Sequence, residues 1–80
     1  MKHTPIRRTS IAAVVRAEMS FHEVSTKALS EAIDMPVNTL RRRLRGVQPL
    51  TLEDLDAICV ALGMEVEDVL RRARERQAAA

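Results

Sequence analysis

The sequence predicts an all-α fold in which five helices form a single domain. Apolar residues recur every three or four positions along most of the 80-residue chain, which is the period of one face of a helix. Both glycines and two of the three prolines stand where that period breaks. No stretch alternates apolar and polar residues as a half-buried strand does. Phe21 is the only aromatic residue, so the core has to be aliphatic.

The first helix is expected to begin at Ser10, whose hydroxyl can accept a hydrogen bond from a free backbone N–H. Its apolar face is interrupted only by Glu18 and consists of Ile11, Val14, Val15 and Met19. Residues 1–9 lack a helical period and predict a flexible N-terminal arm. Residues 77–80 are expected to fray, so the folded domain is expected to cover residues 10–76.

Two short helices separated by a tight turn are predicted next. Ser25 is the expected cap of the first, whose apolar stripe comprises Ala28, Leu29, Ala32 and Ile33. Pro36 has a fixed φ and no N–H, which suits the first turn of the second helix. That helix is expected to run from Pro36 or Val37 to Arg45 and to end at Gly46. Two short helices at a steep angle are the arrangement that places one helix in the major groove of DNA.

Two longer helices complete the predicted domain. Thr51 is the expected cap of the fourth helix, which ends at Gly63 and has the apolar face Leu52, Leu55, Ile58, Cys59 and Leu62. The fifth helix has acidic residues in its first turn and arginines later, an order that suits the helix dipole. Its apolar face is Val66, Val69, Leu70 and Ala73.

The charge is distributed unevenly although the net charge is only +2. Residues 1–50 contain nine basic and four acidic residues, which gives +5, whereas residues 51–80 contain four and seven, which gives −3. This asymmetry favours contact between the N-terminal part and a polyanion. The late arginines Arg71, Arg72, Arg74 and Arg76 are interpreted as offsetting nearby acids rather than as following a DNA backbone.

The third helix is predicted to pack by one edge and to present hydrogen-bond donors on the other. At about 100° per residue, Val37, Leu40 and Leu44 form a narrow apolar seam. Arginine pairs with guanine or phosphate and asparagine with adenine, so the predicted base contacts are Val37, Asn38, Arg41 and Arg42. Free N–H groups at the start of the preceding helix attract phosphate. The predicted phosphate contacts are Thr26, Lys27, Thr39, Arg43, Arg45 and Gln48.

The chain resembles the helix-turn-helix family of phage Cro proteins and lambda-type repressors, the xenobiotic-response-element family. The resemblance extends from about Ile11 to Ala73. It rests on residues 26–46, on Pro49-Leu50-Thr51-Leu52-Glu53-Asp54-Leu55, on Ile58-Cys59-Val60-Ala61-Leu62-Gly63 and on Val66-Glu67-Asp68-Val69-Leu70. Three positions depart from the family pattern: Asp34 replaces a glycine in the turn, Ser30 replaces an alanine, and Pro36 replaces a capping serine or threonine.

The resemblance implies a sequence-specific regulator of transcription that binds double-stranded DNA, commonly as a homodimer on a near-palindromic operator. It places the family's phosphate-clamping position on Thr26 and its base-reading positions on Val37, Asn38, Arg41 and Arg42. An 80-residue chain has no room for the extra domain of larger repressors, so a Cro-like regulator or a minimal phage repressor is expected. Its expected location is the cytoplasm of a bacterial host cell.

Other classes of function are disfavoured by the sequence. His3 and His22 have no ligand partners at metal spacing, and lone Cys59 lies on an apolar face without a positioned histidine. The chain has no glycine-rich phosphate loop, and a domain this small has little space for a substrate pocket. We therefore expect no enzyme activity, metal, cofactor, small-molecule substrate or membrane span.

Two alternatives to a simple regulator stay open at this point. A protein-interaction module, such as an antitoxin or an anti-regulator, would use the acidic C-terminal part and an exposed apolar edge of the fourth or fifth helix. A DNA-bending accessory factor would also bind nucleic acid but would differ in the bend angle of the bound site.

Overall fold

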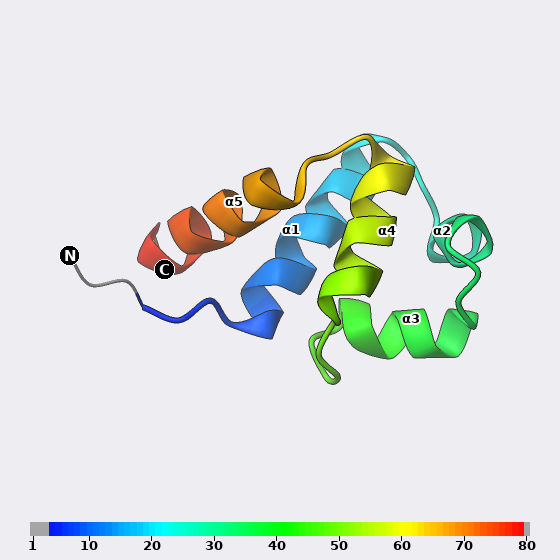
Figure 1. The fold of residues 1–80 in the computed structure, drawn as a ribbon, viewed down its shortest axis with the longest axis horizontal. Coiled ribbons are helices and arrows are strands. Elements are labelled where there is room, and N and C mark those ends of the chain that lie inside the picture. The colour runs from blue at the N-terminus through cyan, green and yellow to red at the C-terminus, as the bar shows by residue number, and fades with distance from the viewer. Residues whose placement is uncertain (1–3, 80) are drawn as a thin grey trace.

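The computed structural model describes residues 4–79, which form five helices and no strand (Figure 1). They are α1 (Arg8–Phe21), α2 (Thr26–Ala32), α3 (Val37–Leu44), α4 (Leu52–Leu62) and α5 (Val66–Ala79). Helix α1 packs against α5 and α3, while α2 packs against α3 and α4. Figure 1 shows α3 at one end of the molecule, away from α5. The predicted all-α fold is confirmed.

The core takes at least one fully buried side chain from every helix. These side chains are Val15, Leu29, Leu40, Ile58, Cys59 and Val69. Each large aliphatic side chain removed from water contributes roughly 1.5–3 kcal/mol to folding. Burial also raises the pKa of the Cys59 thiol, which keeps it protonated as a core residue. Helix α3 is thus anchored to the same core as the other four helices.

Two of the three expected helix caps are present. Ser25 Oγ accepts from the backbone N–H of Ala28 at 3.0 Å, and Thr51 Oγ1 accepts from that of Asp54 at 3.0 Å. The expectation for Ser10 was wrong, because α1 begins earlier, at Arg8, with Arg7 in the capping position. Ser10 is buried in the first turn, and its backbone N–H donates to the Arg7 carbonyl.

The N-terminal segment lies beside the end of α5. Gln77 Oε1 accepts from the Arg7 backbone N–H at 2.7 Å, and Gln77 Nε2 donates to the Pro5 carbonyl at 3.2 Å. Arg74 Nη1 donates to the Thr4 carbonyl at 3.2 Å. Helix α5 extends to Ala79, and the side chain of Gln77 in its last turn bonds to Arg7 and Pro5. Residues 1–3 of the expected arm and Ala80 of the expected tail lie outside the described residues.

Each of the first four helices is followed, one or two positions after its last residue, by a residue with a left-handed backbone. The φ angles are 57° at Glu23, 56° at Asp34, 75° at Gly46 and 70° at Gly63. In each case the next backbone N–H bonds back to a carbonyl five residues earlier, as in the motif that commonly closes a helix. Glycine takes this conformation freely, whereas the two acidic residues are strained by it.

Four large apolar side chains of the described residues are exposed: Phe21, Val47, Leu52 and Val60. Leu52 was expected in the apolar face of α4 but is 71% exposed, because this first residue of the helix lies beyond the packed part of the face that starts at Leu55. Val60 is 74% exposed on the outer side of α4, and Phe21 is 80% exposed at the end of α1.

Candidate nucleic-acid interface

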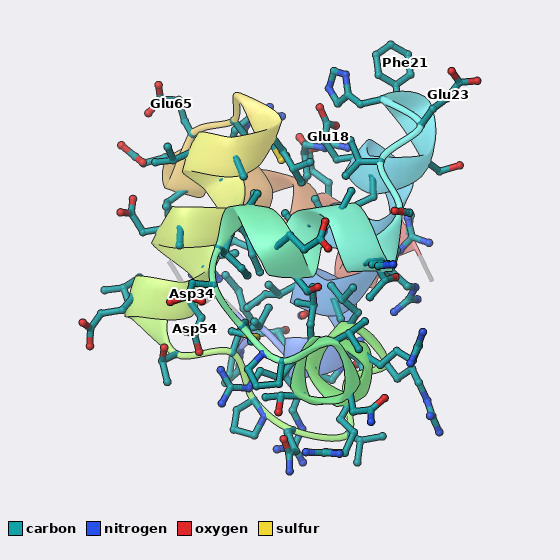
Figure 2. All side chains as sticks on the ribbon, turned by 90° about the vertical axis from the view of Figure 1, so that its right-hand side faces the viewer. Glu18, Phe21, Glu23, Asp34, Asp54 and Glu65 are labelled. Carbon is teal, nitrogen blue, oxygen red and sulfur yellow. The ribbon has the colours of Figure 1, made fainter. Side chains whose placement is uncertain are left out.

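Helix α3 has the buried edge and the exposed face that its sequence predicts. Leu40 is 0% and Leu44 is 4% exposed, and both pack in the core. Asn38, Arg41 and Arg42 are exposed to solvent, whereas Val37 at the first position is partly buried. Figure 2 shows nitrogen-tipped side chains gathered around α3, and Glu18, Glu23 and Glu65 at the opposite end of the molecule. The two ends of the molecule therefore differ in charge.

A hydrogen bond links two of the predicted base contacts. Arg41 Nη1 donates to Asn38 Oδ1 at 3.0 Å, one turn apart on the exposed face. The Asn38 oxygen has a second lone pair and its amide nitrogen has two N–H groups, so the pair still offers both donors and an acceptor. These are the groups that pair with base edges in the major groove.

A groove borders α3 on the side of α1 and α2. Its volume is about 350 Å³, and its apolar floor includes Met19, Val24 and Leu44. The polar residues around it are Arg16, Ser20, Ser25, Thr26, Arg41 and Arg45. Two predicted phosphate contacts, Thr26 and Arg45, thus lie on one groove together with the predicted base contact Arg41.

The other predicted phosphate contacts are placed differently. Lys27 is exposed near the start of α2, while Thr39 and Gln48 are partly buried. Arg43 is turned away from the others: its guanidinium is ion-paired with Asp54 in the first turn of α4. Arg43 is therefore a bridge between α3 and α4 in this structure, and its guanidinium is occupied by Asp54.

The C-terminus of α3 is bound by a residue that the sequence analysis did not select. Arg16 Nη1, from α1, donates to the Leu44 carbonyl, one of the last carbonyls of α3. A cation at this end of a helix is favoured by the helix dipole. Within the sequence, Arg16 is one more charged residue of an amphipathic helix, and no local pattern shows that α3 lies beside it.

Two of the four arginines of α5 are paired with acids, which is the role that the sequence interpretation favoured for this cluster. Arg71 pairs with Asp68 and Glu75, and Arg72 pairs with Glu18 of α1. These pairs stabilise α5 and its packing on α1, and they offset the charges of Arg71 and Arg72 within the domain.

Comparison with known proteins identifies this arrangement. Residues 14–75 match the model of the Cro/C1-type HTH DNA-binding domain. The chain belongs to the Cro/C1-type helix-turn-helix family. The match includes α2 and α3 as the helix-turn-helix and covers most of the chain, so the resemblance drawn from the sequence is confirmed.

Two crystal structures of the clp gene regulator ClgR from Corynebacterium glutamicum are similar to this Cro/C1-type protein. One is 31% identical with a TM-score of 0.80, over 88% of this chain and 91% of that chain. The other is 32% identical with a TM-score of 0.84, over 94% of this chain and 83% of that chain. No curated protein sequence gives a significant match. The expected function class, DNA binding in the regulation of transcription, is confirmed.

None of the helices within residues 4–79 has the length and apolar character needed to cross a bilayer.

Proposed function

We propose that this protein regulates transcription by reading the major groove of double-stranded DNA with α3. Asn38, Arg41 and Arg42 contact base edges, and Val37, at the start of the helix, contacts a thymine methyl group. The observation that supports this proposal is the shape of α3: two leucines fix it in the core while the donor-rich side faces solvent. A recognition helix needs this combination, because its register on DNA depends on a rigid attachment.

Phosphate contacts on either side of α3 fix its position on the duplex. Thr26 and Arg45 border the groove beside α3, and exposed Lys27 lies next to Thr26. Thr39 and Gln48 complete the set from the flank of α3 and from the turn that follows it. Phosphate contacts orient a protein without reading sequence, whereas base contacts specify the site.

The proposed operator is near-palindromic and is bound by two copies of the chain. The eight residues of α3 are about 12 Å long, since a helix rises 1.5 Å per residue. That length spans only about four base pairs at 3.4 Å each, which is too short a site to be distinctive in a genome. A symmetric pair doubles the site, with half-sites roughly 34 Å apart on one face of the DNA.

Repression is the regulatory outcome that we propose, as in Cro-like proteins. A domain seated in the major groove over a promoter blocks access of other proteins to the same DNA. Because its ligand is chromosomal or phage DNA, we place the protein in the bacterial cytoplasm and assign it no enzymatic step. The two ClgR structures, described as those of a gene regulator, support the regulatory role.

Binding to selected and random duplexes tests the proposal. A site is first obtained by selection from a random DNA pool, and affinities are then measured by fluorescence anisotropy at fixed salt. We expect Arg42→Ala to cost about 1–3 kcal/mol on the selected site and much less on random DNA. Arg76→Ala, at the far end of α5, is the matched control. Equal losses on both duplexes would make Arg42 a phosphate contact, and binding that does not respond to salt would exclude DNA as the ligand.

A protein-interaction module is the second candidate, favoured by one observation. Val60 and Leu52 are both more than two-thirds exposed on α4, within the acidic part of the chain. Such side chains suit an antitoxin or anti-regulator that docks by α4. A pull-down that captures a defined partner, lost in Val60→Asp, from a protein that binds no duplex would favour this function.

A further inference from the structure

We propose that Arg16, on α1 and outside the helix-turn-helix, contacts a phosphodiester group of the bound DNA. This inference rests on the proposed major-groove binding by α3. Arg16 borders the same groove as Arg41 and Arg45, so α1 and the C-terminal half of α3 together place three guanidiniums around one concave surface. The groove lies beside the exposed face of α3, where a DNA backbone passes when α3 enters the major groove.

The hydrogen bond to the Leu44 carbonyl orients the Arg16 side chain and leaves other N–H donors of its guanidinium available. Among the described residues, Arg16 uses Nη1 to bond to the Leu44 carbonyl, whereas a guanidinium has five N–H donors. The residue as a whole is exposed, so the other donors are accessible to a ligand. A side chain that is already held in place loses less conformational freedom when it binds a phosphate.

The charges around the groove indicate an anionic ligand. No acidic residue is among those that line it. In contrast, Arg43, Arg71 and Arg72 each pair with a carboxylate elsewhere in the described chain. Within residues 4–79, Arg16 is bound by the Leu44 carbonyl and Arg41 by the Asn38 amide oxygen, both of them uncharged groups. A phosphate would supply the missing negative charge.

The remaining lining suits a nucleotide backbone rather than a free anion. Thr26 and Ser25 add hydroxyl groups to the rim, and the apolar floor of Met19, Val24 and Leu44 can contact a deoxyribose. The ligand class is therefore a phosphate within a DNA strand.

The decisive experiment is the salt dependence of DNA binding in Arg16→Gln. Glutamine keeps an N–H donor on a shorter side chain but has no charge, so this variant removes the charge that a phosphate would contact. Each phosphate contact contributes about −0.9 to the slope of log affinity against log salt. We expect the slope of Arg16→Gln to be less negative by about 0.9, that of Arg16→Lys to equal the wild type, and that of the control Arg76→Gln to be unchanged. All slopes are measured below the thermal midpoint of every variant.

A second measurement locates the contact without relying on a variant's stability. Duplexes with single methylphosphonate substitutions remove one phosphate charge at a time. One position should weaken binding of the wild type but not that of Arg16→Gln. If Arg16→Gln keeps the wild-type slope and no such position exists, Arg16 only caps α3 and the inference is overturned. If the wild type shows no salt-dependent binding at all, the proposed function itself fails.

Discussion

Arg72 Nη1 of α5 donates a hydrogen bond of 2.9 Å to Glu18 Oε1 of α1. His22 Nε2 lies 2.9 Å from the other oxygen of the same carboxylate. This pair explains why the apolar face of α1 contains one acid: Glu18 stands at the edge of that face and joins α1 to α5. The hydrogen bond from Arg72, followed by that from His22, lowers the pKa of Glu18.

Glu18→Gln should therefore destabilise the domain at neutral pH but not at low pH. A carboxyl group whose pKa is lowered by folding stabilises the folded state above its unfolded pKa, near 4.3, and loses this contribution as the pH falls through the folded pKa. We expect a loss of about 1 kcal/mol at pH 7, since the pair is partly exposed. Urea unfolding of the wild type and of Glu18→Gln at pH 7 and at pH 3 measures this loss of stability. Glu31→Gln, at an exposed position of α2, is the control. A difference between Glu18→Gln and the wild type that persists at pH 3 would refute the ionic explanation.

Asp34→Gly should stabilise the domain, although it removes a charged side chain. Asp34 has a φ of 56° at the end of α2, where a residue with a Cβ is strained by about 1–2 kcal/mol. Glycine also gives the unfolded chain more conformational entropy, which offsets part of the relieved strain. The free energy of unfolding should therefore rise by a net amount of about 0.5–1 kcal/mol. Thermal unfolding should show a higher midpoint. Glu31→Gly, inside α2, should have the opposite effect, and a decrease in both variants would mean that Asp34 makes a compensating interaction.

The local features of the fold were predictable from the sequence because they depend on near neighbours. Ser25 and Thr51 cap helices because their hydroxyls reach an N–H three residues on. Leu40 and Leu44 are buried as their spacing indicates. Contacts between segments that are distant in the sequence were not predictable in this way. The end of α5 is held by residues 5 and 7, whose contacts with Gln77 span about 70 positions in the sequence.

In the interface, too, features within one helix were predictable from the sequence and contacts between helices were not. Asn38, Arg41 and Arg42 lie on one exposed face because the helix period places them there. The partner of Arg43 is on α4, and the carbonyl bound by Arg16 is on α3, so both depend on how the helices pack. A helical wheel describes one helix at a time and contains no such information.

Gly46→Ala should destabilise the domain more than Gly63→Ala. Both glycines have a left-handed φ, so each substitution is strained by about 1–2 kcal/mol. A Cβ on Gly63 meets nothing within 4 Å, whereas a Cβ on Gly46 would lie 2.8 Å from Thr9 Cγ2 and 3.2 Å from Thr9 Cα. The excess loss should be about 1–3 kcal/mol, the usual range for overpacking. Urea unfolding of the two variants measures it.

The double variant Gly46→Ala with Thr9→Ala isolates the steric contribution. Thr9→Ala removes Cγ2 but leaves the backbone contact, so it should recover part of the excess loss and not all of it. If the two single glycine variants are equally stable, the close approach of Thr9 to Gly46 has no energetic consequence.

Arg43→Met should lower the stability of the domain and leave the salt dependence of DNA binding unchanged. The Arg43 guanidinium is ion-paired with Asp54, and both side chains are only about a quarter exposed. Removing one partner of such a pair leaves the carboxylate without its hydrogen bond, which costs about 1–3 kcal/mol. Because this cation is already compensated within the protein, it should displace no counterion from DNA.

Arg41→Met is the matched comparison, since Arg41 lies two residues away on the exposed face of the same helix. Its slope of log affinity against log salt should be less negative by about 0.9 if Arg41 meets a phosphate, and its affinity should fall selectively on the chosen site if it meets a base. A reduced slope in Arg43→Met would instead show that Arg43 leaves Asp54 for a phosphate when DNA binds. In that case Asp54→Asn should raise the affinity for random duplex DNA, because it releases the competing guanidinium.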